Sequence, residues 1–267
     1  MDLTIATPQP IFSDTRLRAT LFAADADKLV VTFDNRKLGK TDFEHRDPAR
    51  NFLSANFAQL HIATKVNDWF VNASTGALEA ELVKLRGRYS TVRAIGFSMG
   101  GYGALRFSGA LGIQEVALIS PQISIERAVV PFETRYKREA RRFDGQIGAL
   151  ETANTDLGGI VCYDPFHKLD TAHAAQIAAA FPRIKRAPMA FGQHPATGIL
   201  RECKATGKVL RQVVQGFDAQ ALKADHRAAC RATALYWERL AARAIPGHRD
   251  LADMAAQRAR EITAEIG

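Results

Sequence analysis

The sequence has 267 residues, of which 47% are hydrophobic and 24% are charged. A chain of this length and composition fits one large domain with a substantial core, and it excludes a disordered or fibrous protein. No run of about 18 or more apolar residues is present, which excludes an ordinary transmembrane helix. The segment Met1–Ile5 lacks the basic and apolar regions of a signal peptide, so we expect a cytoplasmic protein.

The formal net charge is +8, which on its own would suit an anionic partner. The basic residues are spread along the chain, however, and their densest group, Arg135–Arg142, accompanies no nucleic-acid-binding motif. We therefore expect no nucleic-acid partner. The three cysteines, Cys162, Cys203 and Cys230, show neither a C-x-x-C pair nor zinc-ligand spacing with a histidine. They are predicted to be reduced thiols, and no metal or organic cofactor is expected.

The first third of the chain is predicted to form mainly strands. Apolar and β-branched residues favour strands at Asp2–Ala6, Leu17–Phe22, Asp27–Phe33 and Leu60–Lys65. The third of these strands ends abruptly at Asp34 and Asn35, where a polar loop begins. Leucines at helical spacing then predict an amphipathic helix over Thr75–Arg86.

Two features near the strand at residues 60–65 allow more than one interpretation. An aromatic pair, Trp69 and Phe70, follows the strand, and it either lines a substrate pocket or packs against the next helix. His61 lies within the strand itself, which favours a buried or sheet-facing histidine over a catalytic one.

The segment 91–111 places a serine between a strand and a helix. Thr91–Ile95 is a short apolar strand, and apolar residues from Ala104 onward recur at helical spacing. Between them, Gly96 and Gly100 flank Ser98 as G-x-S-x-G. Glycines allow the strained backbone that a tight strand-to-helix turn requires, and such a turn exposes the serine hydroxyl. We predict that Ser98 is a nucleophile.

Strands and helices alternate in the remainder of the chain. Further strands are predicted at Glu115–Ile119, Gly159–Tyr163 and Lys185–Phe191, with helices through Phe181 and over Gly198–Val214. This alternation predicts an α/β fold, with a mostly parallel sheet covered by helices on both faces. In such a sheet the functional crevice lies at the carboxyl ends of the strands.

Two segments depart from the alternation. Residues 123–157 form a charged, helix-prone insertion, and residues 216–267 form a helical extension that is broken near Ile245–Gly247. We therefore divide the chain into a core at 1–215, which includes the insertion, and an extension at 216–267. The extension has three open roles: packing on the core, mediating a homodimer, or binding a partner protein.

Residues 96–105, G-F-S-M-G-G-Y-G-A-L, resemble the serine elbow of the α/β-hydrolase superfamily, and the likeness extends over about residues 25–210. The resemblance implies that the 123–157 insertion is a cap over Ser98. It also implies an oxyanion hole made by the backbone N–H of Met99 and one from the loop at Asp34 or Asn35.

A catalytic serine needs a histidine base and an acid that orients the base. In α/β-hydrolases the chain order is serine, acid, histidine, and Ser98, Asp164 and His194 occur here in that order. Asp164 and His194 each follow a predicted strand, so we predict that these three residues form a triad.

Rival residues lie close to each of the last two positions. Asp170 is the alternative acid, although its place at the start of a helix favours an N-cap or first-turn role. His173 would lie on that helix, and His167 precedes the last predicted strand, so both are poorly placed as the base. His45, His226 and His248 have no supporting context.

The sequence thus predicts a serine hydrolase that cleaves an ester or thioester through an acyl-enzyme. Two alternatives stay open: an acyltransferase with the same triad, and a non-catalytic binding protein on a hydrolase scaffold. Trp69, Tyr102 and Arg138 are the residues expected on the substrate side. The basic residues of the insertion either meet an anionic substrate group or form a solvated face.

Overall fold

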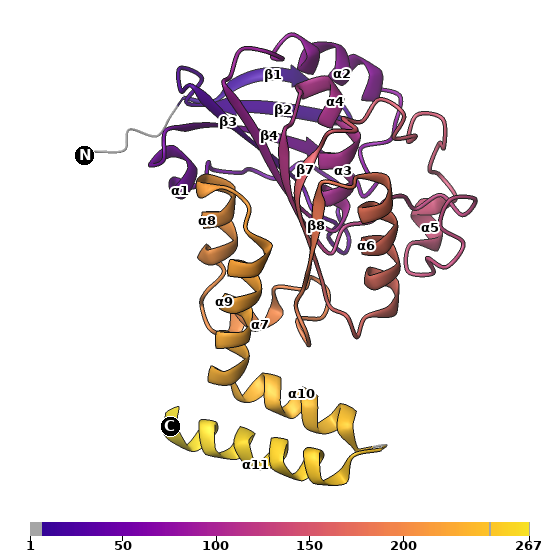
Figure 1. Ribbon diagram of the computed structural model, residues 1–267. Coiled ribbons are helices and arrows are strands. Elements are labelled where there is room, and N and C mark those ends of the chain that lie inside the picture. The colour runs from indigo at the N-terminus through magenta and orange to yellow at the C-terminus, as the bar shows by residue number, and fades with distance from the viewer. Residues whose placement is uncertain (1–6, 246, 267) are drawn as a thin grey trace.

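The computed structural model describes residues 7–245 and 247–266. Its centre is an eight-stranded sheet with the order β1-β2-β4-β3-β5-β6-β7-β8 (Figure 1). The strands are β1 (Gln9–Ser13), β2 (Leu17–Phe22), β3 (Lys28–Phe33), β4 (Phe57–Thr64), β5 (Thr91–Phe97), β6 (Glu115–Ile119), β7 (Gly158–Tyr163) and β8 (Ile184–Pro188). Strands β1 and β2 are antiparallel to their neighbours, and β4, β3, β5, β6, β7 and β8 are parallel.

Helices cover both faces of this sheet (Figure 1). They are α1 (Arg50–Leu53), α2 (Thr75–Val83), α3 (Met99–Arg106), α4 (Ser108–Leu111), α5 (Lys137–Ala140), α6 (Lys168–Ala180), α7 (Gly198–Glu202), α8 (Gly207–Gln215), α9 (Ala219–Ala232), α10 (Ala234–Ala244) and α11 (Arg249–Ile266). The fold class is therefore the predicted mixed α/β arrangement. No helix in the described part of the chain is long and apolar enough to cross a membrane.

The core has two layers, one on each face of the sheet. One layer contains the buried side chains of α2, α3, α4 and α6, for example Leu78 and Tyr102. The other contains those of α1, α7, α8 and α9, for example Phe52 and Val209. The central strand β4 is buried along its whole length, as expected for a strand covered on both faces.

Several predicted elements differ from the observed ones. The strand expected at Asp2–Ala6 lies outside the described residues, and the strand that pairs with β2 is formed by Gln9–Ser13. The helix expected over Gly198–Val214 is divided into α7 and α8. The insertion at 123–157 is mostly irregular, and α5, with four residues, is the helix that the structure describes there.

The extension begins as part of the core. Helix α9 packs on β8 and buries Leu222, Ala229 and Cys230 in the same layer as α7 and α8. Beyond Thr233, α10 and α11 pack mainly on each other and extend away from the sheet (Figure 1). The division of the chain at residue 215 and the homodimer stay predictions.

Candidate active site

Ser98 lies in a tight turn between β5 and α3. Its backbone has φ 49° and ψ −117°, outside the regions that side chains ordinarily favour. The turn needs glycines: a Cβ on Gly96 would collide with the Gly100 carbonyl, and one on Gly101 would lie 2.7 Å from a side-chain carbon of Pro121. The Ser98 N–H donates to the Ile119 carbonyl at 2.9 Å, so the turn is anchored to the end of β6.

A hydrogen-bonded chain connects Ser98 with a histidine and an aspartate. His194 Nε2 lies 3.0 Å from Ser98 Oγ, and His194 Nδ1 lies 2.8 Å from Asp170 Oδ2. The Asp170 side chain is fully buried, whereas that of His194 is 24% exposed. A carboxylate accepts hydrogen bonds, so Nδ1 carries the proton and Nε2 is free to accept one from Ser98.

The prediction that Asp164 is the partner of His194 is wrong. Asp164 is buried, and its carboxylate accepts three backbone N–H groups, from Phe166 at 3.0 Å, Phe191 at 3.2 Å and Gln193 at 2.7 Å. These bonds hold the loop that carries His194, and the carboxylate that His194 Nδ1 contacts is that of Asp170. The position after β7 thus has a structural task.

Asp170 reaches the imidazole from the first turn of α6. His167 caps this helix by accepting the Asp170 N–H through Nδ1 at 3.2 Å. Burial raises the pKa of Asp170, but the His194 hydrogen bond and the charges of His194, Arg135 and His167 outweigh burial and hold that pKa below its usual range. The first-turn position that the sequence predicted is correct, and it is compatible with contact to His194.

Backbone N–H groups at two places are suitable for an oxyanion. Met99 is the first residue of α3, and neither its N–H nor that of Asn35 has an acceptor among the described residues. The two segments adjoin, because a Cβ on Gly100 would lie 2.8 Å from the Asp34 carbonyl. The Asp34 N–H donates to Ile62 at 3.0 Å, which removes Asp34 as a donor.

The side chain of Asp34 has a different task, which is to hold this loop. It is buried and contacts His61 Nε2 at 3.3 Å, the Thr64 N–H at 3.2 Å and Lys40 Nζ at 3.3 Å. Burial raises the pKa of Asp34, but His61 and Lys40 outweigh burial and lower it. His61 is therefore a buried partner of Asp34, as the sequence favoured.

Three side chains that contact one another in series, Gln122, Trp69 and Tyr136, extend from Ser98. Gln122 Oε1 lies 3.4 Å from Ser98 Oγ and accepts the indole N–H of Trp69 at 3.2 Å. The Trp69 ring packs against Tyr136, with 4.7 Å between ring centroids. Trp69 thus borders the site, whereas Phe70 packs in the core against Phe33.

Two of the predicted substrate-side residues lie elsewhere. Tyr102 is fully buried, and its hydroxyl donates to the Gly148 carbonyl at 2.6 Å, so it anchors the insertion. Burial raises its pKa. Arg138 is exposed on α5. The basic residue that reaches the site is Arg135, whose Nη1 lies 2.7 Å from Asp170 Oδ1 and 3.4 Å from His194 Nδ1.

Sequence reasoning also missed Gln122, Glu133 and Tyr136. Gln122 follows β6 at the carboxyl edge of the sheet, so its position in the sequence was a usable signal. Glu133 and Tyr136 belong to an irregular segment, where no periodicity indicates which side chains point inward. His173 is fully buried, on the same face of α6 as Asp170.

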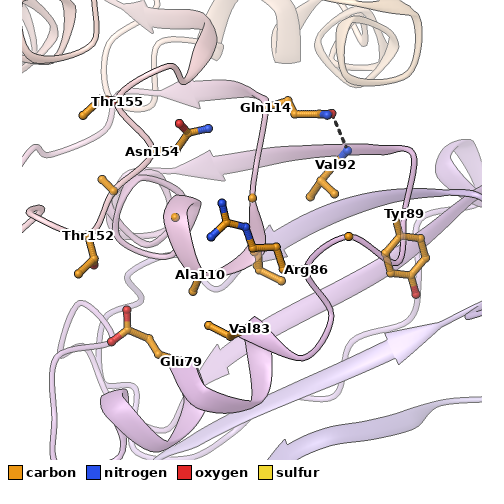
Figure 2. A pocket seen from close by; sticks show the side chains of 15 residues that line it. Glu79, Val83, Arg86, Tyr89, Val92, Ala110, Gln114, Thr152, Asn154 and Thr155 are labelled. Carbon is orange, nitrogen blue, oxygen red and sulfur yellow. Dashed lines mark hydrogen bonds between the residues drawn. The ribbon is translucent and has the colours of Figure 1, made fainter.

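A hollow of about 700 Å³ lies away from these residues, at the amino ends of the strands (Figure 2). It is lined by residues that include Arg86, Val92 at the start of β5, and Gln114 just before β6. The Gln114 side chain accepts the Val92 N–H at 3.0 Å, as the dashed line in Figure 2 shows. Because parallel strands place their amino and carboxyl ends at opposite edges, this hollow is separate from Ser98. No cluster of three potential metal ligands occurs in the described ranges.

Comparisons with known proteins show the fold of the chain. No family model and no curated protein matches it. Among solved structures, the capsule O-acetyltransferase of Neisseria meningitidis serogroup A is 14% identical, with a TM-score of 0.54 over 81% of this chain and 97% of that chain. A mutant of that enzyme in complex with CoA is 15% identical, with a TM-score of 0.52 over 77% and 99%. A fungal esterase from Rhizomucor miehei is 14% identical, with a TM-score of 0.51 over 79% and 84%.

Proposed function

We propose that this protein is a serine hydrolase that cleaves an ester or thioester through an acyl-enzyme on Ser98. The observation that carries the proposal is the continuous chain from Ser98 Oγ through His194 to Asp170, with heavy-atom distances of 3.0 and 2.8 Å. These distances lie within hydrogen-bond reach, and the turn at Ser98 presents its hydroxyl beside a helix N-terminus. Asp170 takes the role that the sequence gave to Asp164.

The first half-reaction forms the acyl-enzyme. His194 Nε2 takes the hydroxyl proton as Ser98 Oγ attacks the acyl carbon, and the carbonyl oxygen becomes an oxyanion that the N–H groups of Met99 and Asn35 can stabilise. The bond to the leaving group then breaks, and His194 returns the proton to the departing oxygen or sulfur. Asp170 stabilises the imidazolium throughout, because it accepts the Nδ1–H.

The second half-reaction returns the free enzyme. Water gives a proton to His194 Nε2 and attacks the acyl carbon, the ester bond to Ser98 breaks, and His194 reprotonates the Ser98 oxygen. The products are a carboxylic acid and the regenerated serine. No residue other than His194 is needed to move protons.

Acyl transfer to an alcohol is the second candidate function. It uses the same acyl-enzyme, with a hydroxyl acceptor in place of water. The fold likeness to an O-acetyltransferase, one structure of which contains CoA, favours it as the alternative. Incubation with an acyl thioester separates the two functions: hydrolysis releases free acid at a rate that added alcohols leave unchanged, whereas transfer yields an ester with the acceptor.

Labelling by a fluorophosphonate probe tests the proposal directly. The wild-type protein and a Ser90→Ala variant, which changes an exposed serine bonded to Asp27, should react equally. Ser98→Ala should not react. A wild type that stays unlabelled beside a reactive control hydrolase, or a Ser98→Ala variant that labels as the wild type does, would contradict the nucleophile.

A further inference from the structure

The insertion contributes a buried ion cluster that contacts the triad from the side opposite Ser98. Arg135 lies between two carboxylates, with Nη1 2.7 Å from Asp170 Oδ1 and Nη2 2.6 Å from Glu133 Oε2. The side chains of Glu133 and Asp170 are 2% and 0% exposed, and that of Arg135 is 20% exposed. Two carboxylates thus share one guanidinium within a largely closed site.

Among the described residues, the groups that contact the Glu133 carboxylate are all donors. Arg135 supplies its backbone N–H at 2.7 Å, its Nε at 3.0 and 3.1 Å and its Nη2 at 2.6 Å. His173 supplies Nε2 at 2.9 Å, and its Nδ1 accepts the Ile123 N–H at 3.3 Å. This arrangement fixes His173 as a neutral donor, so Arg135 is the cation that balances Glu133.

The charges in this cluster determine what Asp170 offers to His194. Arg135 alone would neutralise Asp170, because its guanidinium contacts one carboxylate oxygen while His194 contacts the other. Glu133 supplies a second negative charge to the same guanidinium. Glu133, Arg135 and Asp170 together then carry one net negative charge, which is the charge that an imidazolium at His194 requires.

This inference rests on the proposed function of Ser98, His194 and Asp170. We propose that Glu133 and Arg135 are positioning residues of the catalytic centre: Arg135 fixes the Asp170 carboxylate, and Glu133 neutralises Arg135 so that Asp170 keeps its charge for His194. The role of the insertion is therefore electrostatic as well as steric.

Removing the charge of Arg135 and removing the charge of Glu133 should shift the protonation of His194 in opposite directions. Arg135→Gln removes a cation 3.4 Å from His194 Nδ1, which favours the imidazolium. Glu133→Gln leaves Asp170 as the one carboxylate of this cluster that balances Arg135, and this change disfavours the imidazolium form of His194. Among the described residues, the other ionisable groups that face His194 are Asp170 and His167, whose ring centroid is 6.0 Å from that of His194, and both are unchanged in these variants.

The test measures the titration of His194 by NMR in protein with ¹³C-labelled histidine. The signal is assigned among the seven histidines with a His194→Gln variant. Relative to the wild type, Arg135→Gln should raise the midpoint by roughly 1 pH unit, the low end of the shift caused by a charge within about 4–6 Å. Glu133→Gln should lower it, Arg135→Lys should leave it nearly unchanged, and the double Gln variant should lie between the two single variants.

The acid limb of the kcat/KM profile of an ester substrate should move in the same directions, because His194 must be neutral to act as a base. Equal midpoints in all variants, or shifts of the same sign for Arg135→Gln and Glu133→Gln, would overturn the proposal and leave a merely structural latch. If Glu133→Gln does not fold, Glu133→Asp replaces it and should keep the wild-type midpoint. Opposite NMR shifts in a protein that the fluorophosphonate does not label would support the charge coupling and reject the proposed hydrolase.

Discussion

Replacement of Asp170 by asparagine should abolish most of the activity without opening the site. In the wild type, one carboxylate oxygen faces Arg135 at 2.7 Å and the other faces His194 at 2.8 Å. A guanidinium can only donate, so the amide oxygen of an asparagine should turn toward Arg135. Its NH₂ group would then face His194 Nδ1 and require that nitrogen to accept.

The consequence is the wrong tautomer of His194. With the proton on Nε2, the ring cannot take the proton of Ser98, which lies 3.0 Å away. An acid-to-amide change that traps the wrong tautomer lowers kcat by about 10⁴-fold in serine hydrolases, or roughly 5.4 kcal/mol of transition-state stabilisation. We expect a loss of that order for Asp170→Asn.

Asp164→Asn is the matched control, because it makes the same chemical change at the residue that the sequence favoured. It removes the acceptor of the Gln193 N–H, a bond of 2.7 Å, which should cost about 1–3 kcal/mol of unfolding free energy. Its kcat should stay within about tenfold of the wild type. The assays are kcat on a chromogenic ester and urea unfolding, and a kcat for Asp170→Asn within tenfold of the wild type would refute the assignment of the acid.

Three further predictions concern the turn at Ser98, the buried ion cluster and α10. Gly96→Ala places a methyl group against the Gly100 carbonyl, so its free energy of unfolding in urea should be lower than that of the wild type by at least about 1–3 kcal/mol. Gly76→Ala, where the added Cβ meets no atom within 4 Å, should show no such loss. Burial raises the pKa of Glu133, but hydrogen bonds from His173 and Arg135 outweigh burial and lower that pKa from 4.5 to about 2. The stability that ionised Glu133 contributes is therefore complete above pH 4.5 and is lost as the pH falls toward 2. The urea midpoint of Glu133→Gln should consequently fall less between about pH 5 and pH 3 than that of the wild type. Arg239 on α10 donates to the Phe191 carbonyl at 2.6 Å, in the loop that carries His194. Arg239→Ala should therefore lower kcat/KM by roughly fivefold, or about 1 kcal/mol. An unchanged kcat/KM would show that α10 does not hold this loop.

The sequence was sufficient to predict the fold because its signals are local and strong. Strands β2 and β6 have the predicted bounds, and β5, the glycines and α3 place Ser98 between a strand and a helix. These elements depend on β-branched runs, helical spacing and small residues at a tight turn, all of which are visible within about ten residues. The loop after β8 also carries His194, as predicted.

The errors concern side chains whose orientation depends on contacts between distant segments. Asp164 and Asp170 are six positions apart, and what distinguishes them is that the Asp164 carboxylate accepts three backbone N–H groups whereas that of Asp170 contacts His194. Arg135 and Arg138 belong to one basic run, and only the path of an irregular segment decides which of them turns inward. The paired positions Asp170 and His173 at helical i, i+3 spacing were a signal that α6 presents polar side chains to the site.

The position of the acid on α6 explains why the insertion needs two charges. The first turn of a helix already favours a carboxylate, and Arg135 favours the ionised form of Asp170 further. Each of these effects weakens the attraction that Asp170 exerts on an imidazolium at His194, because part of its charge is already compensated. Glu133 opposes that loss, and since Glu133 and Arg135 lie on the same segment, any displacement of the segment removes one negative and one positive charge together. The net charge that Asp170 presents to His194 is then preserved, although the orientation of the Asp170 carboxylate is not.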